Sequence, residues 1–231
     1  MTNHWTVLVT ASLATLLALF APAHVARADI FQWEYINPTD PDLGKQQSTM
    51  LAPDGAGANA VPAANLSNRN LAQAYLIGAN LMGSNLTNTN LAGYEYYQSA
   101  DLTGANLSQS NLTNAHFQSA HLLGGEYNYA NGANLTNADL SQANLTNANF
   151  SGEFVLYEDT GYIVAGADLT GANLSGAQSL GASFTYATLT GANLAGAEVR
   201  GAGFSYSGIT AAQLYSTASY QAHDLTGIEF S

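Results

Sequence analysis

Apolar residues recur at every fifth position through most of this chain, in runs that are separated by slips of phase. A small residue, such as Ala105 or Ala138, stands two positions before most of them. The repeating unit is therefore Ala-(Asn/Asp)-Leu-(Ser/Thr)-x. The unit recurs at Leu66, Leu71, Leu76, Leu81, Leu86 and Leu91, at Leu102, Leu107, Leu112, Phe117 and Leu122, at Leu135, Leu140, Leu145 and Phe150, and at Leu169, Leu174, Ser179, Phe184, Leu189, Leu194, Val199, Phe204, Ile209 and Leu214.

A period of five fits neither of the regular secondary structures. Five residues of an α-helix turn by about 140°, so the leucines would spread around every side of the helix. In a straight β-strand, successive leucines would alternate between the two faces, because five is odd. The chain can bury all of them only if it bends by a constant angle at each unit and winds around an axis that the leucines share.

The unit resembles the consensus A(D/N)LXX of the pentapeptide-repeat family. The resemblance covers residues 64–214, with a last fragment at 225–230. It implies an all-β fold, a right-handed quadrilateral parallel β-helix with four units in each coil. The Leu or Phe and the preceding small residue would face inward, and the other three positions would face solvent. We expect this pentapeptide-repeat solenoid to span residues 64–209.

The segment before the repeats, residues 1–28, has the pattern of a secretory signal peptide. The apolar run Val7–Phe20 is shorter than the roughly 20 residues of a membrane span, and Pro22 follows it. Residues 26–28 then form a small-x-small site, so we expect cleavage after Ala28. The segment departs from this pattern in one respect, because its N-terminal region contains no Lys or Arg. A membrane anchor or a buried strand is the alternative interpretation of the apolar run. Cleavage predicts an exported protein (periplasm, cell surface or extracellular) without a stable membrane span.

Charge is scarce, and its balance is acidic. Only 9% of the 231 residues are charged, with four Lys and Arg against sixteen Asp and Glu and no cysteine. This composition excludes a long exposed helix or coiled coil and the basic surface of a nucleic-acid binder. Stacked coils place like residues above one another, where like charges repel and neutral Asn, Ser and Thr are tolerated.

Segments outside the repeat are expected at both ends of the rod. Residues 29–63 contain an aromatic cluster around Trp33 and predict an N-terminal cap, with an aromatic ligand site as the alternative. Arg69 occupies an inward position of the first coil, where we expect it to bond carbonyl groups or a carboxylate such as Asp29 or Glu34. At the other end, residues 210–231 predict a short helical insert with a capping box at Thr210, followed by a last partial coil.

Three insertions interrupt the repeat, at residues 93–99, 125–132 and 152–166, and each joins an acid to aromatic residues. The third is expected to form a small hairpin around residues 158–161. Counting units along the chain places the three insertions on different faces, so we expect separate contact surfaces and no paired-carboxylate site. The candidate interaction residues are Tyr94, Glu95, Tyr96, Tyr97, Glu126, Tyr127, Tyr129, Glu153, Phe154, Tyr157 and Tyr162.

The sequence carries no signature of catalysis or of a bound metal or cofactor. His116 and His121 fall in consecutive units and therefore on neighbouring faces, without an acidic partner close by, so we expect no metal site. No nucleophile–base pair, phosphate-binding loop or zinc motif is visible. We expect a protein that is not an enzyme, and the Lys- and Arg-poor repeats disfavour an enzyme acting on polysaccharides.

These observations favour an exported, non-catalytic structural or protein-interaction module whose partner is a protein or a surface polymer. The resemblance suggests an alternative, an acidic DNA mimic acting on DNA gyrase. The predicted signal peptide and the sparse acids within residues 64–209 oppose it. A Ser/Thr ladder that orders water is a weaker alternative, because the ladder is interrupted. A homodimer through one end of the rod is a further expectation.

Overall fold

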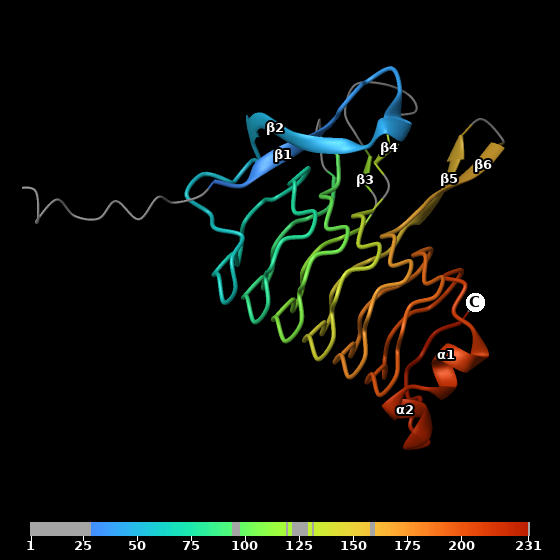
Figure 1. Cartoon of the computed structure of the whole chain (residues 1–231). Coiled ribbons are helices and arrows are strands. Elements are labelled where there is room, and N and C mark those ends of the chain that lie inside the picture. Colours follow the sequence, from blue (N-terminus) through green and yellow to red (C-terminus); the bar gives the residue numbers. More distant parts are fainter. Residues whose placement is uncertain are drawn as a thin grey trace, which may run out of the picture.

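In the computed structural model, residues 29–93, 98–118, 120–121, 129–130, 132–157 and 160–230 are described. The predicted signal peptide, residues 1–28, lies outside them. The elements are β1 (Phe31–Tyr35), a 3₁₀ turn (Pro41–Leu43), β2 (Lys45–Leu51), β3 (Ala120–His121), β4 (Tyr129–Ala130), β5 (Glu153–Tyr157), β6 (Thr160–Val164), α1 (Ala211–Tyr215) and α2 (Ala218–Gln221). Most of the described chain between residues 64 and 210 lies outside these elements and winds through successive coils (Figure 1).

Successive coils are joined by isolated parallel β-bridges between like positions. Asn65 is bridged to Asn85, 20 residues on, and the N–H of Leu66 donates to the Asn85 carbonyl at 2.8 Å. Four columns of bridged residues run along the rod, one for each unit of a coil. The Asp101 column consists of Tyr75, Asp101, Asn134, Asp168 and Thr188, and the Asp139 column consists of Asn80, Asn106, Asp139, Asn173 and Asn193.

The polar residues of the unit produce the bend that the period predicts. The side-chain oxygen of Asn85 accepts hydrogen bonds from the N–H and the hydroxyl of Thr87, at 3.1 and 2.7 Å. Such a local turn is typical of Asn and Asp. The following residue, Asn88, has a φ of 56°, in the left-handed region that Asn and Gly adopt most readily. Because this arrangement recurs in most units, the chain turns by a similar angle at each.

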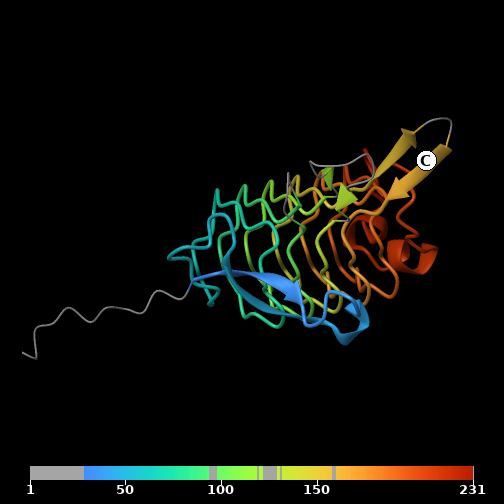
Figure 2. The same cartoon turned by 90° about the horizontal axis from the view of Figure 1, so that it is seen from above.

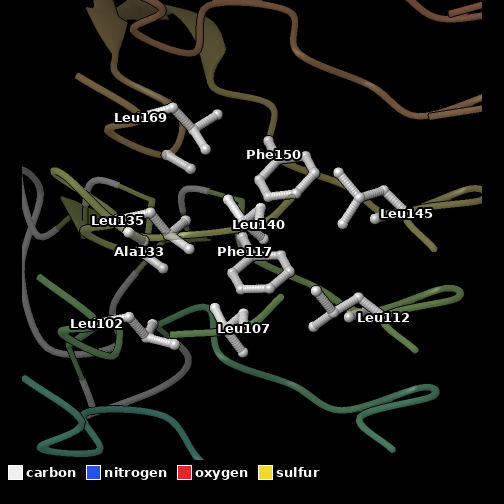
Figure 3. Close-up of a cluster of buried hydrophobic side chains, with 14 of the residues drawn as sticks. Leu102, Leu107, Leu112, Phe117, Ala133, Leu135, Leu140, Leu145, Phe150 and Leu169 are labelled. Atoms are coloured by element: carbon white, nitrogen blue, oxygen red, sulfur yellow. The ribbon is translucent and has the colours of Figure 1, made fainter. Parts of the chain in front are cut away.

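The core is a stack of like side chains. Leu102, Leu135 and Leu140 are fully buried, and Figure 3 shows the leucines and phenylalanines of consecutive coils lying above one another. The rings of Phe117, Phe150, Phe184 and Phe204 stack with centroids 4.7, 5.0 and 5.1 Å apart and planes within 9° of parallel. This ring spacing matches the separation of about 4.8 Å between neighbouring β-strands, so backbone pairing and ring stacking are satisfied together.

Residues 52–64 lie over the first coil. Ala52 and Ala58 are buried there, and a carboxylate oxygen of Asp54 accepts a hydrogen bond from the N–H of Asn70 at 2.6 Å. Arg69 is half-buried and donates to the carbonyl oxygen of Asp54 at 2.7 Å. The prediction of a carbonyl partner for Arg69 is confirmed. The suggested carboxylates are engaged elsewhere: Asp29 accepts from the N–H of Gly57, and Glu34 accepts from Gln46.

Helices α1 and α2 cover the last coil. The predicted capping box is confirmed, because the N–H of Thr210 donates to the side chain of Gln213 and the N–H of Gln213 donates back to Thr210. The Gln213 side chain also donates to the carbonyl oxygens of Leu189 and Ala192, at 2.8 and 2.9 Å. The two helices therefore satisfy backbone groups that a further coil would otherwise bond. No helix of the described residues is long and apolar enough to cross a membrane.

Leu140→Ala is expected to lower the free energy of unfolding by about 2–5 kcal/mol, because it opens a cavity in a fully buried stack. Leu140→Asp should be more damaging, because it buries a carboxylate. Asn144→Asp is the control, because Asp retains the oxygen that accepts from Thr146. Urea denaturation measures all three variants. Equal losses for Leu140→Asp and Asn144→Asp would contradict this register.

A groove beside the stacked insertions

All three insertions leave the rod at one corner. The residues before them, Asn90, His116 and Asn149, are bridged to one another, and those after them belong to the Asp101 column. The prediction that the insertions lie on different faces is therefore wrong. It counted the inserted residues as part of the coils, whereas the structure sets them outside the coils. Thus Asp101 is bridged to Asn134, 33 positions on, although only four units of the coil lie between them. The remaining residues belong to the insertion.

Each insertion is closed at its base by the same hydrogen bond. The N–H of Ala100 donates to the carbonyl of Leu91, that of Ala133 to Phe117 and that of Ala167 to Phe150, all at 2.8 Å. An uninterrupted corner makes the equivalent bond between residues three apart, as from Ala74 to Leu71 at 3.1 Å. The insertions therefore replace the tip of one turn and leave the coils in register.

Glycines allow the bases of neighbouring insertions to touch. A Cβ atom on Gly132, in the second base, would lie 2.4 Å from the carbonyl carbon of Gly166 and 2.3 Å from the backbone nitrogen of Ala167, in the third base. Within the third base, a Cβ atom on Gly166 would lie 2.3 Å from the carbonyl oxygen of Phe150. Real Cβ atoms do not approach backbone so closely, so only glycine fits. The N–H of Gly132 donates to the carbonyl of Ala165 at 3.0 Å, which ties the second base to the third.

The second and third insertions carry short antiparallel hairpins. In β3 and β4, His121 pairs with Tyr129, and in β5 and β6 the pairs run from Glu153–Val164 to Tyr157–Thr160. The predicted hairpin in the third insertion is thus present. Of the candidate interaction residues, Tyr129 lies in β4, Glu153, Phe154 and Tyr157 lie in β5, and Tyr162 lies in β6. The others, Tyr94, Glu95, Tyr96, Tyr97, Glu126 and Tyr127, lie outside the described residues.

The N-terminal hairpin of β1 and β2 runs along the side of the rod (Figure 2). It is attached at one coil edge, where the N–H of Trp33 donates to the carbonyl of Gln73 and the N–H of Tyr75 donates to the carbonyl of Phe31, both at 2.8 Å. The segment predicted as a cap over the first coil therefore has two parts: residues 52–64 lie over the end, and the hairpin lies along a side.

The aromatic cluster fastens this hairpin to the rod. Trp33 is only 7% exposed, and its indole N–H donates to the carbonyl of Ser99 at 2.8 Å. The ammonium of Lys45 lies 3.9 Å from the centre of the Trp33 ring and 2.7 Å from a carboxylate oxygen of Asp101. The side chain of Asp101 is 3% exposed, so this ion pair neutralises a buried acid. Tyr35 meets the Trp33 ring edge-on at 5.4 Å and is itself exposed.

A groove of about 360 Å³ separates the hairpin from the corner of the insertions. The hairpin forms one wall with aromatic and cationic side chains, and the bases of the insertions and the Asp101 column form the other. Sequence reasoning missed this groove because it placed the insertions on separate faces. The lining residues are Trp33, Tyr35, Lys45, Gln98, Ser99, Ala100, Gly132, Asn134, Ala165, Gly166, Asp168 and Thr188.

The groove shows no arrangement of metal ligands. Among the described residues, no group of three or more His, Asp or Glu side chains could hold a metal ion. His116 lies in the column that precedes the insertions, and His121 lies in β3. The groove offers a ligand hydrogen-bonding side chains and one exposed aromatic ring, that of Tyr35.

Comparison with known proteins identifies the family. The family described as Pentapeptide repeats matches eight copies, at residues 63–93, 98–125, 130–152 and 165–205, which together make up more than half of the chain. The chain therefore belongs to the pentapeptide-repeat family. No curated protein matches it in sequence.

Several solved pentapeptide-repeat proteins are similar to this chain, with low TM-scores. Rfr23 from the cyanobacterium Cyanothece is 28% identical over 68% of this chain and 87% of its own, with a TM-score of 0.33. HetL from the cyanobacterium Nostoc, which is involved in the regulation of heterocyst differentiation, is 28% identical over 71% and 65%, with a TM-score of 0.25. A protein of the Arabidopsis thaliana thylakoid lumen is 24% identical over 64% and 72%, with a TM-score of 0.24.

Gly132→Ala is expected to lower the free energy of unfolding by about 1–3 kcal/mol, because the added methyl group collides with the backbone of Gly166 and Ala167 in the next base. Gly203→Ala is the matched control. Its methyl group would lie 3.4 Å from the nearest atom, a hydroxyl oxygen of Thr185. Thermal denaturation compares the two variants, and equal losses would show that the bases of the insertions are not in contact.

Lys45→Met is expected to detach the hairpin, because it leaves the buried carboxylate of Asp101 without its cation. The double variant Lys45→Met/Asp101→Asn should recover much of the stability, since Asn retains the oxygen that accepts from Thr103. Trp33 is the only tryptophan after residue 28, so its fluorescence reports the docking directly. A double variant no more stable than Lys45→Met would contradict this role for the ion pair.

Proposed function

We propose that this protein is an exported, non-catalytic interaction module that binds a protein or a surface polymer at the corner where the insertions meet. The observation that carries the proposal is the gathering of three insertions and the N-terminal hairpin around one groove. In the other three columns, most of the bridged residues are Asn. We take the coils to wind right-handed with a four-sided section, as the family resemblance implies, and this shape makes the corner a continuous edge of the rod.

The distribution of polar groups supports binding in preference to catalysis. Asp168 is the one carboxylate among the residues that line the groove, and the buried Asp101 of the same column is neutralised by Lys45. General acid–base chemistry on a glycosidic bond needs two carboxylates free to act across the substrate. Such a pair does not occur among the lining residues, which fits a surface that recognises its partner without changing it.

The test is capture of envelope or culture material by the purified protein. Replacing residues 153–163 with a short Gly-Ser linker should reduce capture, because it removes β5 and most of β6 from the corner while retaining the base at Gly152 and Gly166. Tyr215→Ser is the control, because it removes a ring that is 52% exposed on helix α1, over the last coil. Equal capture by the linker variant and the unchanged protein would overturn the proposal.

Export is tested separately by sequencing the mature N-terminus, which we expect to be Asp29.

The alternative function is an acidic DNA mimic that acts on DNA gyrase. A formal net charge of −12 agrees with it. The described rod opposes it, because one of its few acids, Asp101, is buried and paired, and the bridged columns hold Asn at most positions. Protection of gyrase against a quinolone by the purified protein would support this alternative over the interaction module.

A further inference from the structure

The Asp101 column differs from its neighbours in the way its side chains are used. In the Asp139 column, the amide of Asn173 donates to Asp139 and the amide of Asn193 donates to Asn173, both at 3.2 Å. Such ladder bonds consume polar groups within the rod. Among the described residues, no side-chain hydrogen bond joins neighbouring members of the Asp101 column.

Three consecutive coils therefore present free hydrogen-bonding groups to the groove. The Oδ1 atoms of Asn134 and Asp168 accept from the backbone two residues on, at 3.0 and 2.9 Å. The amide nitrogen of Asn134, the Oδ2 of Asp168 and the hydroxyl of Thr188 have no partner among the described residues. Together they form a row containing a donor, an acceptor and a group that can act as both, at the coil spacing of about 4.8 Å.

The opposite wall supplies an aromatic surface. Tyr35 is 37% exposed at the groove, while its edge-on contact with Trp33 fixes its orientation. A ring of this kind can cover the apolar face of a pyranose, and carboxylate, amide and hydroxyl groups bind sugar hydroxyls. Because an extended pyranose chain advances by about one coil spacing per sugar, successive sugars could meet successive coils.

Two other ligand classes fit less well. A peptide strand binds through the backbone edge of a sheet, but the backbone N–H groups of Asn134 and Asp168 already donate to Ala100 and Ala133, at 3.1 and 3.0 Å. An anionic polymer would meet the carboxylate of Asp168 in a protein of net charge −12. The one cation of the groove, Lys45, is already paired with Asp101.

We propose that the groove between the N-terminal hairpin and the Asp101 column binds a strand of neutral polysaccharide, with Tyr35 as the stacking surface and Asn134, Asp168 and Thr188 as the row that binds hydroxyl groups. This inference rests on the proposed function and narrows the partner to an uncharged glycan. It assigns the sugar contacts to the lining residues of the groove.

The test is calorimetric titration of the purified protein with β-1,4-linked hexasaccharides of glucose, mannose and N-acetylglucosamine. Hexagalacturonate is the anionic comparison. At least one neutral hexasaccharide should bind, and hexagalacturonate should not. Tyr35→Ala and Asp168→Ala should each weaken binding about tenfold. Asp139→Ala should bind as the unchanged protein does, because it makes the same chemical change in the neighbouring column.

Asp168→Asn guards against a failure to fold, because Asn retains the oxygen that accepts from Thr170 while it replaces the free acceptor with a donor. This variant should unfold at the same temperature as the unchanged protein and still bind more weakly. Binding of none of the neutral hexasaccharides would overturn the inference, and so would binding that survives both Tyr35→Ala and Asp168→Ala. A polypeptide captured through the groove would also overturn it. Capture of envelope material that depends on residues 153–163, without sugar binding, would overturn this inference alone.

Discussion

The stacking of like residues at the spacing of hydrogen-bonded strands is the constraint on which the rest of this structure depends. Each coil bonds only to the coils before and after it, so every position must tolerate a copy of itself about 4.8 Å away. Leucine and phenylalanine meet this requirement inside, where the rings of Phe150 and Phe184 lie almost parallel. Asparagine meets it outside, because its amide can donate to the amide above. A row of carboxylates would repel, which explains why so few charges occur in the chain.

The same constraint determines where the rod can accept inserted residues. An insertion is tolerated at a corner because the hydrogen bond from Ala133 to Phe117 closes its base and maintains the path of the coil. Once one insertion occupies a corner, its neighbours can pack against it through glycine. The groove therefore arises from three separate departures from the repeat that the stacking brings together. Its other wall is the N-terminal hairpin, which is fastened by Trp33 and Lys45.

The sequence predicted the repeat well and the site poorly, for a physical reason. The period of five, the inward leucines and the capping box at Thr210 depend on neighbours in the chain, so local reasoning was sufficient for them. The meeting of the insertions depends on which residues belong to a coil, and the unit count from Glu95 to Glu126 included residues that lie outside it. The repeat restarts at Ala100-Asp101 and at Ala133-Asn134. These restarts indicate where each insertion ends and the coil resumes. The ion pair of Lys45 and Asp101 joins residues 56 positions apart, and no local pattern indicates it.

A chain of near-identical units has many almost equivalent ways to wind, because a slip of five residues replaces each leucine with another leucine. The ion pair of Lys45 and Asp101 has no such substitute. Lys45 is the only lysine of the chain, and Asp101 is the only buried acid among the described residues. Any slipped winding would leave that carboxylate desolvated without its cation. Together with the single column of stacked phenylalanines and the glycines at the bases of the insertions, this contact distinguishes the native register from windings that the repeat alone would leave nearly degenerate in energy.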